Sequence, residues 1–429
     1  MATLADAMDM DIPTTRTTRP ADADPGLLAT DLAYARALDS VDPLAPFRGR
    51  FFIPDPEVVY LDGNSLGRPP TAAIDAVTRT ASAEWAGDLI RSWDHWLDAP
   101  LRVGDLLAPL IGAGPDEVAV TDSTTVNLFR VASAVLDARP SRRAVAVSRN
   151  DFPTDRYVIE GLAAARDLEI RWIDEDAIEG VAVGDMESVL DEDLALLVLS
   201  HVNYRSAAIA DLPAITARAR EVGAMVIWDL SHSGGGVPVD LTVAGADLAV
   251  GCTYKYLNGG PGAPGYLFVR KELQGKLRPP IQGWFAQADQ FEMGPRFVAR
   301  EGIAGWLVGT PGMLGLAAAE AGIALSAEAG IGRIRSKGVA LTAYAVALLD
   351  AWLAPRGCTL GSPRDPERRG NHVSILHPQA RQLTRELISS GVIPDFRAPN
   401  AIRLGLSPLT TSFEDVWRGM TALRVLLEH

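Results

Sequence analysis

Seven short β-rich runs, separated by amphipathic helical stretches, constrain the fold more than any other feature of this sequence. The run Leu194–Leu199 contains only leucine, alanine and valine, which is typical of a strand in a sheet covered on both faces. The predicted strands are Glu117–Thr121, Ala144–Ser148, Leu168–Ile173, Leu194–Ser200, Met225–Asp229, Leu248–Thr253 and Gly265–Val269. Their alternation with helices predicts an α/β domain of three layers with a mostly parallel sheet.

The pattern changes after about residue 320. This part of the chain holds a long Ala-rich helical stretch, two strand-like runs and a closing helix, at Leu314–Leu353, His372–Leu376, Ala401–Leu406 and from Ser412 onward. We therefore predict a smaller α+β domain after the large one. The predicted division is a flexible leader at 1–25, an N-terminal segment at 26–70 that joins the small domain, the large domain at 71–320 and the small domain at 321–429.

Charge and cysteine usage restrict the partners and the compartment. The formal net charge of −14 argues against nucleic acid as a partner, because an acidic chain repels phosphate backbones. The only two cysteines, Cys252 and Cys358, have neither disulfide nor metal-ligand spacing, which suits a reducing cytoplasm. The uncharged stretch Gly302–Ala319 is interrupted by glycine and proline, so we expect a buried loop and helix there and no membrane association.

Lys255 is the first candidate for chemistry. The chain contains only four lysines, and this one alone lies between a predicted buried strand and the glycine-rich turn Gly259–Gly262. Burial of an amine favours its neutral, nucleophilic form, which can attack an aldehyde. Taken alone, a lysine on a loop is more often an ordinary surface residue.

Asp229 changes that interpretation. It ends the apolar strand that contains Trp228, a poor place for a carboxylate without a partner. A carboxylate against the pyridine nitrogen of pyridoxal phosphate (PLP) keeps that nitrogen protonated, so that the ring accepts electrons. A helix N-cap is the competing interpretation for Asp229 alone. The combination with His232, Tyr254 and Lys255 is much more specific for PLP.

Two further segments suit the same cofactor. Thr124 and Thr125 follow a predicted strand and open a helix, where hydroxyl and backbone N–H groups suit a phosphate, although simple capping is the alternative. Phe152 begins the sequence Phe-Pro-Thr-Asp after the next strand, and its ring can stack on a pyridine ring or belong to the core.

Together these segments resemble the kynureninase family, a branch of the fold type I PLP enzymes. The resemblance extends from Asp42 to Leu427 and includes the motifs Tyr60–Gly67 and Ile393–Arg403. It implies the PLP-dependent transferase-like fold, with a mostly parallel seven-stranded sheet in a large domain and a smaller α+β domain. It also implies a cytoplasmic homodimer with active sites at the interface.

The resemblance assigns roles to individual residues. Lys255 binds the cofactor covalently and moves the Cα proton, Asp229 pairs with the ring nitrogen, and Tyr254 relays a proton to Cβ. The other residues implied around the cofactor are Thr124, Thr125, Phe152, Thr154, Asp155, Ser200, His232, Trp284 and Thr310, with the last two from the partner chain. The residues implied around the substrate are Arg403, which holds the α-carboxylate, and Trp93, Asn64 and Ser65.

The implied reaction is hydrolysis of the Cβ–Cγ bond of an amino-acid substrate, L-kynurenine or a close analogue, to an anthranilate and L-alanine. This places the chain in the kynurenine pathway of tryptophan degradation and NAD biosynthesis. Three segments depart from the family pattern: Phe285–Gln287, Ser206–Ala208 and Gly309–Gly312. They concern the substrate pocket, so the preferred aryl ring stays open between kynurenine, 3-hydroxykynurenine and other ring-substituted kynurenines.

Three alternatives remain. A cysteine desulfurase or lyase of the same class needs a nucleophilic cysteine, for which Cys358 is the candidate. A biosynthetic kynureninase homologue would accept a different aryl substrate. A non-enzymatic protein with a retained fold would be expected to have lost Lys255 or Asp229, and both are present.

Overall fold

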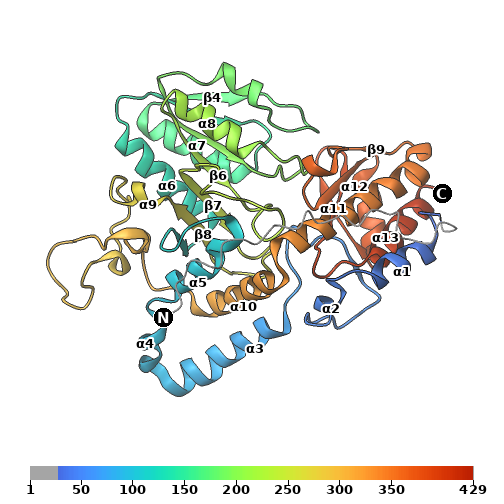
Figure 1. Cartoon of the computed structure of the whole chain (residues 1–429), viewed down its shortest axis with the longest axis horizontal. Coiled ribbons are helices and arrows are strands. Elements are labelled where there is room, and N and C mark those ends of the chain that lie inside the picture. The colour runs from blue at the N-terminus through green and yellow to red at the C-terminus, as the bar shows by residue number, and fades with distance from the viewer. Residues whose placement is uncertain (1–27, 429) are drawn as a thin grey trace, which may run out of the picture.

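The larger of the two lobes in the computed structural model, which describes residues 28–428, is built on a seven-stranded sheet (Figure 1). The strand order is β2-β8-β7-β6-β5-β3-β4. Strand β8 runs in the direction opposite to the other six strands, which are parallel to one another. The strands are β2 (Val118–Val120), β3 (Ala144–Ser148), β4 (Glu169–Ile173), β5 (Leu194–Ser200), β6 (Met225–Asp229), β7 (Leu248–Cys252) and β8 (Gly265–Val269). The predicted mostly parallel sheet is confirmed, and the predicted strand ends lie within one residue of these bounds. The leader predicted at 1–25 lies outside the described residues.

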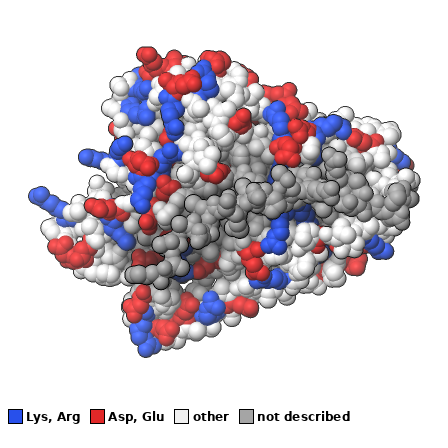
Figure 2. All heavy atoms as spheres, viewed as in Figure 1, with Lys and Arg blue, Asp and Glu red and all other residues white. Residues whose placement is uncertain are grey.

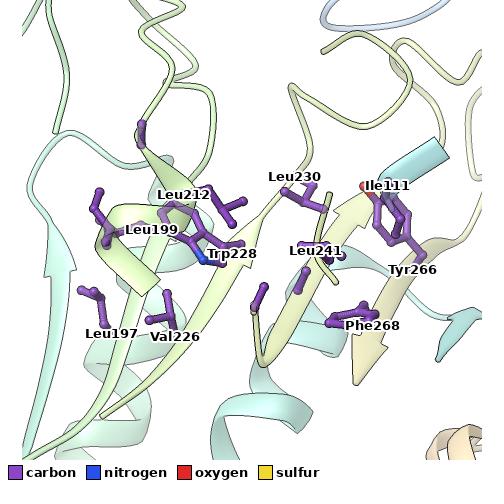
Figure 3. Packing of buried hydrophobic residues seen from close by; sticks show 14 of the residues in the cluster. Ile111, Leu197, Leu199, Leu212, Val226, Trp228, Leu230, Leu241, Tyr266 and Phe268 are labelled. Atoms are coloured by element: carbon purple, nitrogen blue, oxygen red, sulfur yellow. The ribbon is translucent and has the colours of Figure 1, made fainter. Parts of the chain in front are cut away.

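Helices cover both faces of this sheet. One face is covered by α5 (Ala99–Leu107), α8 (Leu212–Glu221) and α10 (Met313–Ala329), and the other by α6 (Thr124–Ala138) and α7 (Pro153–Arg166). Within β6, Val226 and Trp228 face the first layer while Ile227 faces the second, because successive strand residues point to opposite faces. Figure 3 shows Trp228 with Leu199, Leu212 and Val226 around it, and its Nε1 donates to Thr216 Oγ1 of α8 at 3.0 Å.

The smaller lobe contains a four-stranded antiparallel sheet and the N-terminal segment. Its strands, in spatial order, are β12 (Asp395–Arg397), β13 (Ala401–Gly405), β10 (His372–Leu376) and β9 (Thr359–Leu360). Its helices include α1 (Leu32–Ser40), α2 (Ala45–Arg48), α11 (Ile331–Leu348), α12 (Ala380–Ser389) and α13 (Phe413–Leu426), and β1 (Val59–Tyr60) pairs with β11 (Val392–Ile393).

The long helical stretch predicted at Leu314–Leu353 is divided in two. Gly330 adopts a φ of +80°, a conformation that glycine tolerates, and separates α10 from α11. Helix α10 packs on α5 and on α3 (Thr71–Arg79) of the larger lobe, whereas α11 packs on α13 of the smaller lobe. The division predicted at residue 320 therefore falls inside α10.

In the described chain, one helix, Ile331–Arg356, is long and apolar enough to cross a membrane, and about half of its most apolar stretch is buried within the protein.

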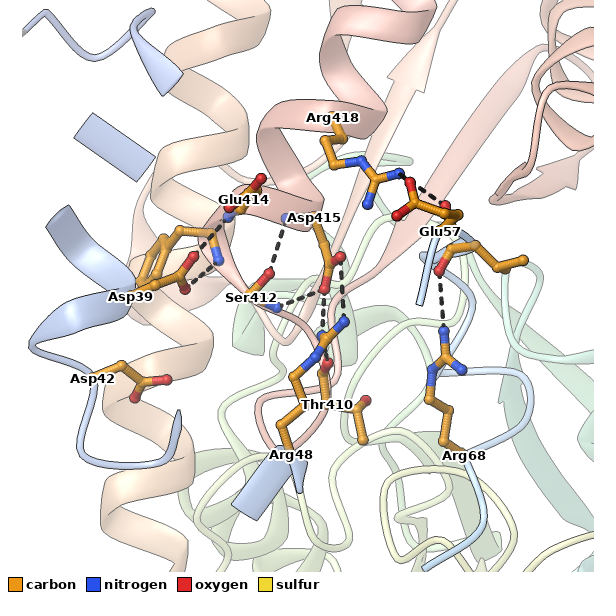
Figure 4. A network of polar contacts seen from close by, with 12 residues as sticks. Asp39, Asp42, Arg48, Glu57, Arg68, Thr410, Ser412, Glu414, Asp415 and Arg418 are labelled. Atoms are coloured by element: carbon orange, nitrogen blue, oxygen red, sulfur yellow. Dashed lines mark hydrogen bonds and ion pairs between the residues drawn. The ribbon is translucent and has the colours of Figure 1, made fainter. Parts of the chain in front are cut away.

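A network of polar contacts joins the N-terminal segment to α13 (Figure 4). Asp39 at the end of α1 accepts hydrogen bonds from the backbone N–H groups of Phe413 and Glu414, at 2.8 and 3.0 Å. In the same region Lys337 of α11 forms a buried ion pair with Asp42, at 2.7 Å. A carboxylate at a helix N-terminus satisfies N–H groups that have no partner within the helix. The N-terminal segment therefore completes the smaller lobe.

Charges of both signs are mixed over the two lobes on the face that Figure 2 shows. Ion pairs at the protein surface include Arg218 with Glu187 and Arg364 with Asp350. Such exposed pairs contribute little stability individually, so the buried apolar side chains of both lobes carry most of the stabilisation.

Replacing Asp39 by alanine tests the contact between α1 and α13. We expect Asp39→Ala to lower the free energy of unfolding by about 1–2 kcal/mol, because two N–H groups of α13 lose their acceptor. Urea unfolding followed by circular dichroism measures the change. Asp75→Ala, on an exposed position of α3, is the control, with an expected change within about 0.5 kcal/mol. Equal stability of the two variants would contradict the proposed role of Asp39.

Candidate active site

The carboxyl ends of β5, β6 and β7 meet at one edge of the sheet, and a cavity of about 120 Å³ lies there. Ser200 at the end of β5 is paired in register with Asp229 at the end of β6. The cavity is lined by Ser123, Thr124, Thr125, Phe152, Thr154, Asp155, Ser200, Val202, Tyr204, Asp229, Ser231, His232, Tyr254 and Lys255. Ten of these were predicted from the sequence as cofactor residues, so one cavity brings those ten together.

One end of the cavity suits a phosphate group. Helix α6 begins at Thr124, and the N-cap residue Ser123 accepts a hydrogen bond from Val126 N at 3.3 Å. The hydroxyls of Thr125 and Thr154 lie 3.5 Å apart across this end. Gly265 permits the close approach of the helix start to β8, because a Cβ there would lie 2.9 Å from Thr124 N. Hydroxyl groups and the N-terminus of a 15-residue helix are suitable donors for a dianion.

The opposite end presents carboxylates. Asp229 is buried, and its Oδ1 accepts hydrogen bonds from Ser231 N at 2.8 Å and Ser231 Oγ at 2.6 Å. Both bonds end on Oδ1, so Oδ2 remains for a protonated ring nitrogen. Burial, and then the charge of Asp229, raises the pKa of the neighbouring Asp155 well above its usual range. A neutral Asp155 can lie beside a charged Asp229, and Ser200 Oγ lies 3.5 Å from Asp155 Oδ2.

Lys255 and His232 form a close pair within the cavity. Lys255 Nζ lies 3.0 Å from His232 Nε2. Burial and then the neighbouring Lys255 lower the pKa of His232 well below its usual range, so the imidazole is neutral. Nε2 therefore accepts a hydrogen bond from the lysine, and the imidazole proton resides on Nδ1.

Two aromatic rings flank the lysine. Lys255 Nζ lies 5.9 Å from the ring centroids of both Phe152 and Tyr254. Phe152 is 37 % exposed and meets Tyr204 edge-on at 5.3 Å, which favours the stacking interpretation over a core phenylalanine. Burial, and then Cys252 and Asp229, raises the pKa of Tyr254, so its phenol keeps its proton and can donate it.

Arg403 lies in a separate polar cluster beside the cavity. Its Nη2 donates to Ser65 Oγ at 2.8 Å and to Asp395 Oδ2 at 2.6 Å, and its Nη1 donates to the backbone oxygen of Tyr204. The Asn64 amide is oriented so that its nitrogen faces Asp62 and its oxygen faces Arg403. The amide oxygen then accepts a hydrogen bond from Arg403 Nε at 3.1 Å. The structure therefore brings Arg403, Asn64 and Ser65 together as predicted, and Tyr204 links this cluster to the cavity.

Asp395 and Arg397 are members of this cluster that the sequence prediction did not include. Asp395 Oδ2 lies 2.6 Å from Nη2 of both Arg397 and Arg403. A substrate carboxylate that binds Arg403 must therefore share its guanidinium with Asp395. The sequence Asp-Phe-Arg before a second strand signalled this arrangement, because alternate residues of β12 point to one face.

Three predicted residues lie outside the cavity of a single chain. Trp93 and Thr310 line an apolar groove together with Trp85, Trp96 and Pro311. Trp284 lies on an outer loop, where its Nε1 donates to the backbone oxygen of Gln290 at 2.7 Å. Within one chain the structure therefore separates these residues from the ten that line the cavity.

The site fits PLP in shape and chemistry. A buried carboxylate faces the ring nitrogen position, a lysine amine stands between two aromatic rings, and a helix start with free hydroxyls faces the phosphate position. Two buried polar atoms of cavity-lining residues, Asp155 Oδ1 and His232 Nδ1, have no hydrogen-bond partner in the described part of the protein, which is consistent with a site built to receive a polar ligand. The fold and the site together define a PLP-dependent enzyme.

Solved structures with the same fold support this class. A cysteine desulfurase from Thermococcus onnurineus NA1 is similar with a TM-score of 0.76 at 19 % identity, covering 92 % of this chain and 98 % of that one. The cysteine desulfurase CsdA of Escherichia coli is similar with a TM-score of 0.75 at 20 % identity, covering 90 % and 99 %. At this identity the likeness shows the fold, which is fold type I of the PLP enzymes.

Sequence relatives identify the family. The kynureninase of Burkholderia mallei strain SAVP1 is 44 % identical over 402 residues, which are 92 % of this chain and 95 % of that protein. The kynureninase of Pseudomonas fluorescens is 42 % identical over 401 residues, with coverage of 92 % and 94 %. The family profile of the kynureninase C-terminal domain matches residues 334–423. The chain belongs to the kynureninase family.

The position of Lys255 generates a direct test. We expect purified protein to be yellow and borohydride to fix the cofactor on the peptide that contains Lys255, because this amine lies in the cavity between two aromatic rings. Peptide mapping by mass spectrometry locates the modification. Lys337, which is buried in an ion pair with Asp42 in the smaller lobe, is an internal control. Label on Lys271, Lys276 or Lys337 in place of Lys255 would contradict the assignment.

Proposed function

We propose that the protein hydrolyses the Cβ–Cγ bond of L-kynurenine or 3-hydroxykynurenine, giving anthranilate or its hydroxylated form and L-alanine. The observation that carries this proposal is 44 % identity to a kynureninase over 92 % of the chain. The gathering of Lys255, Asp229 and Tyr254 in one cavity supports it, because this reaction needs a base, an electron sink and an acid.

Bound PLP supplies a protonated ring that withdraws electrons from the substrate Cα. Asp229 keeps the ring nitrogen protonated, because a buried carboxylate stabilises the adjacent positive charge. The Lys255 amine takes the Cα proton, and the neutral His232, with Nε2 at 3.0 Å, orients the amine as it does so.

The remaining steps need a water and a proton donor. Water adds to the γ-carbonyl, its oxygen stays with the anthranilate carboxylate, and the Cβ–Cγ bond breaks. Tyr254 then donates its phenolic proton to Cβ, and burial keeps that proton in place until Cβ becomes basic. Arg403 holds the α-carboxylate from the smaller lobe, where Asn64 and Ser65 orient its guanidinium.

The apolar groove of Trp93, Thr310 and Pro311 is assigned to the aryl end of the substrate in the assembled dimer. A homodimer is supported by apolar side chains exposed near this groove, including Trp85 at 62 %, Leu89 at 61 % and Ile90 at 76 %. We assign Trp284 and Thr310 of a second chain against this face to the neighbouring phosphate site. We further propose that the protein acts in the cytoplasm, in tryptophan degradation through kynurenine.

The desulfurase alternative finds little support in the cysteines. Cys358 is 2 % exposed within the core of the smaller lobe, and burial raises its pKa to about 11. A desulfurase needs an exposed cysteine that ionises readily, because the thiolate is the nucleophile. Sulfide release from cysteine at a rate comparable to kynurenine cleavage would revive this alternative.

Replacing the ring-nitrogen partner tests the electron-sink role. We expect Asp229→Asn to fold normally and to lower kcat for kynurenine by at least roughly ten- to hundredfold, because a neutral amide no longer holds the nitrogen protonated. Steady-state kinetics and the absorbance of the bound cofactor measure the effect. Ser231→Ala, which removes one hydrogen bond to Asp229 but keeps its charge, is the matched control and is expected to lose much less activity. Wild-type turnover in Asp229→Asn would leave Asp229 with only a structural role in the turn that begins after β6, where the described chain forms no helix.

Two groups of variants test the two ends of the substrate. Arg403→Lys is expected to raise KM for kynurenine and 3-hydroxykynurenine alike, because both present the same α-carboxylate. Exchanges of Trp93, Thr310 or Pro311 are expected to change the kcat/KM ratio between the two compounds, because a ring hydroxyl discriminates strongly where a site pairs with it.

Kinetics of each variant with both compounds give these ratios. A changed ratio in Arg403→Lys, with unchanged ratios in the groove variants, would reverse the assignment of the two ends. Cleavage of neither compound by wild-type protein with bound PLP would contradict the proposed reaction.

A further inference from the structure

The turn before α6, which presents Thr124 and Thr125 to the phosphate position, has an unusual backbone conformation. Asp122 adopts a φ of +51°, in the left-handed region that residues with a Cβ rarely adopt. Backbone hydrogen bonds to β8 hold the turn on one side: Thr121 N donates to Gly265 O at 2.9 Å, and Gly265 N donates to Asp122 O at 2.7 Å. A further interaction must hold the Asp122 side chain in this geometry.

Arg130 of α6 supplies that interaction from inside the protein. Its side chain is fully buried, and its Nη1 donates to Asp122 Oδ2 at 2.6 Å and to Asn127 Oδ1 at 3.0 Å. Asn127 Nδ2 in turn donates to Thr121 O at 2.7 Å, and Thr121 Oγ1 donates to Asp122 Oδ2 at 3.0 Å. Arg130 therefore holds Asp122 directly and Thr121 through Asn127, the two residues before the N-cap Ser123.

The charge of Arg130 is only partly compensated. Nε and Nη2 are buried without a hydrogen-bond partner in the described chain, and the paired Asp122 side chain is 28 % exposed to solvent, which screens its charge. A buried guanidinium with one partner is costly unless further negative charge lies nearby. The Arg130 guanidinium reaches back to Asp122, two residues before Thr124, but Arg130 does not line the cavity, so its charge acts on a dianion at the helix start without direct contact.

We propose that Arg130 is a positioning residue for the cofactor phosphate. It locks the Thr121–Ser123 turn so that the start of α6 faces the phosphate, and its buried charge favours the dianion there. This inference rests on the PLP site described above and adds to it a residue that does not line the cavity. It predicts that loss of Arg130 weakens recognition of the phosphate group and leaves recognition of the pyridine ring intact.

Comparison of PLP with pyridoxal, which lacks the phosphate, tests the proposal on the full-length protein freed of cofactor. Absorbance titration gives the Kd of each compound for wild type, Arg130→Met and Arg130→Lys. Arg130→Met is expected to raise the Kd for PLP at least about tenfold, comparable to the loss of one charge-assisted contact, with the Kd for pyridoxal within about twofold of wild type. Competition by inorganic phosphate is expected to weaken in parallel.

Arg130→Lys keeps the charge but cannot bond Asp122 and Asn127 in the same geometry, so its Kd for PLP is expected between those of wild type and Arg130→Met. This variant decides the question if Arg130→Met does not fold. Arg166→Met, which removes an arginine of α7 paired with Asp137 of α6, is the control and is expected to bind both compounds like wild type.

Equal weakening for PLP and pyridoxal in the Arg130 variants, or wild-type affinity for PLP in Arg130→Lys and Arg130→Met, would overturn the proposal. The proposed function fails separately, because it requires wild-type protein to bind PLP and cleave kynurenine whatever the Arg130 variants do.

Discussion

The buried carboxylate of Asp229 at the end of β6 is the constraint on which the site depends. A charged group in the middle of a sheet covered on both faces is unfavourable unless a partner compensates it, and two bonds from Ser231 only partly do so. Burial and then the charge of Asp229 raise the pKa of the neighbouring Asp155, which keeps its proton and adds no second negative charge. The site is therefore organised to receive a positive charge, which a protonated ring nitrogen supplies.

The opposite end of the cavity has the complementary character. The start of α6, the hydroxyls of Thr125 and Thr154, and the buried charge of Arg130 behind the turn all favour a dianion. A ligand that is positive at one end and doubly negative at the other is thereby oriented before any covalent bond forms. Lys255 lies between these ends, where an aldehyde on the ring would meet its amine.

The substrate end of the site depends on the contact between the two lobes. Arg403 belongs to β13 of the smaller lobe, but it donates to the backbone of Tyr204, which lines the cavity in the larger lobe. The N-terminal segment contributes Asn64 and Ser65 to the same cluster and is itself held against α13 by Asp39. Residues far apart in the chain therefore set the orientation of one guanidinium, and Asp395 competes with any carboxylate that approaches it.

The sequence by itself determined the sheet and most of the cofactor cavity. Strands such as Leu194–Ser200 are apolar on both faces, which only a covered sheet allows, and residues that end parallel strands must meet at one edge. Only the tertiary structure decided the rest. Tyr204 and Asp395 contact Arg403, and Arg130 contacts Asp122, only in the folded chain, and of these contacts the sequence signalled only that of Asp395, through the Asp-Phe-Arg segment. Trp93, Thr310 and Trp284 do not line the cavity of one chain, because the folded chain places Trp93 and Thr310 in an apolar groove and holds Trp284 by a hydrogen bond to Gln290.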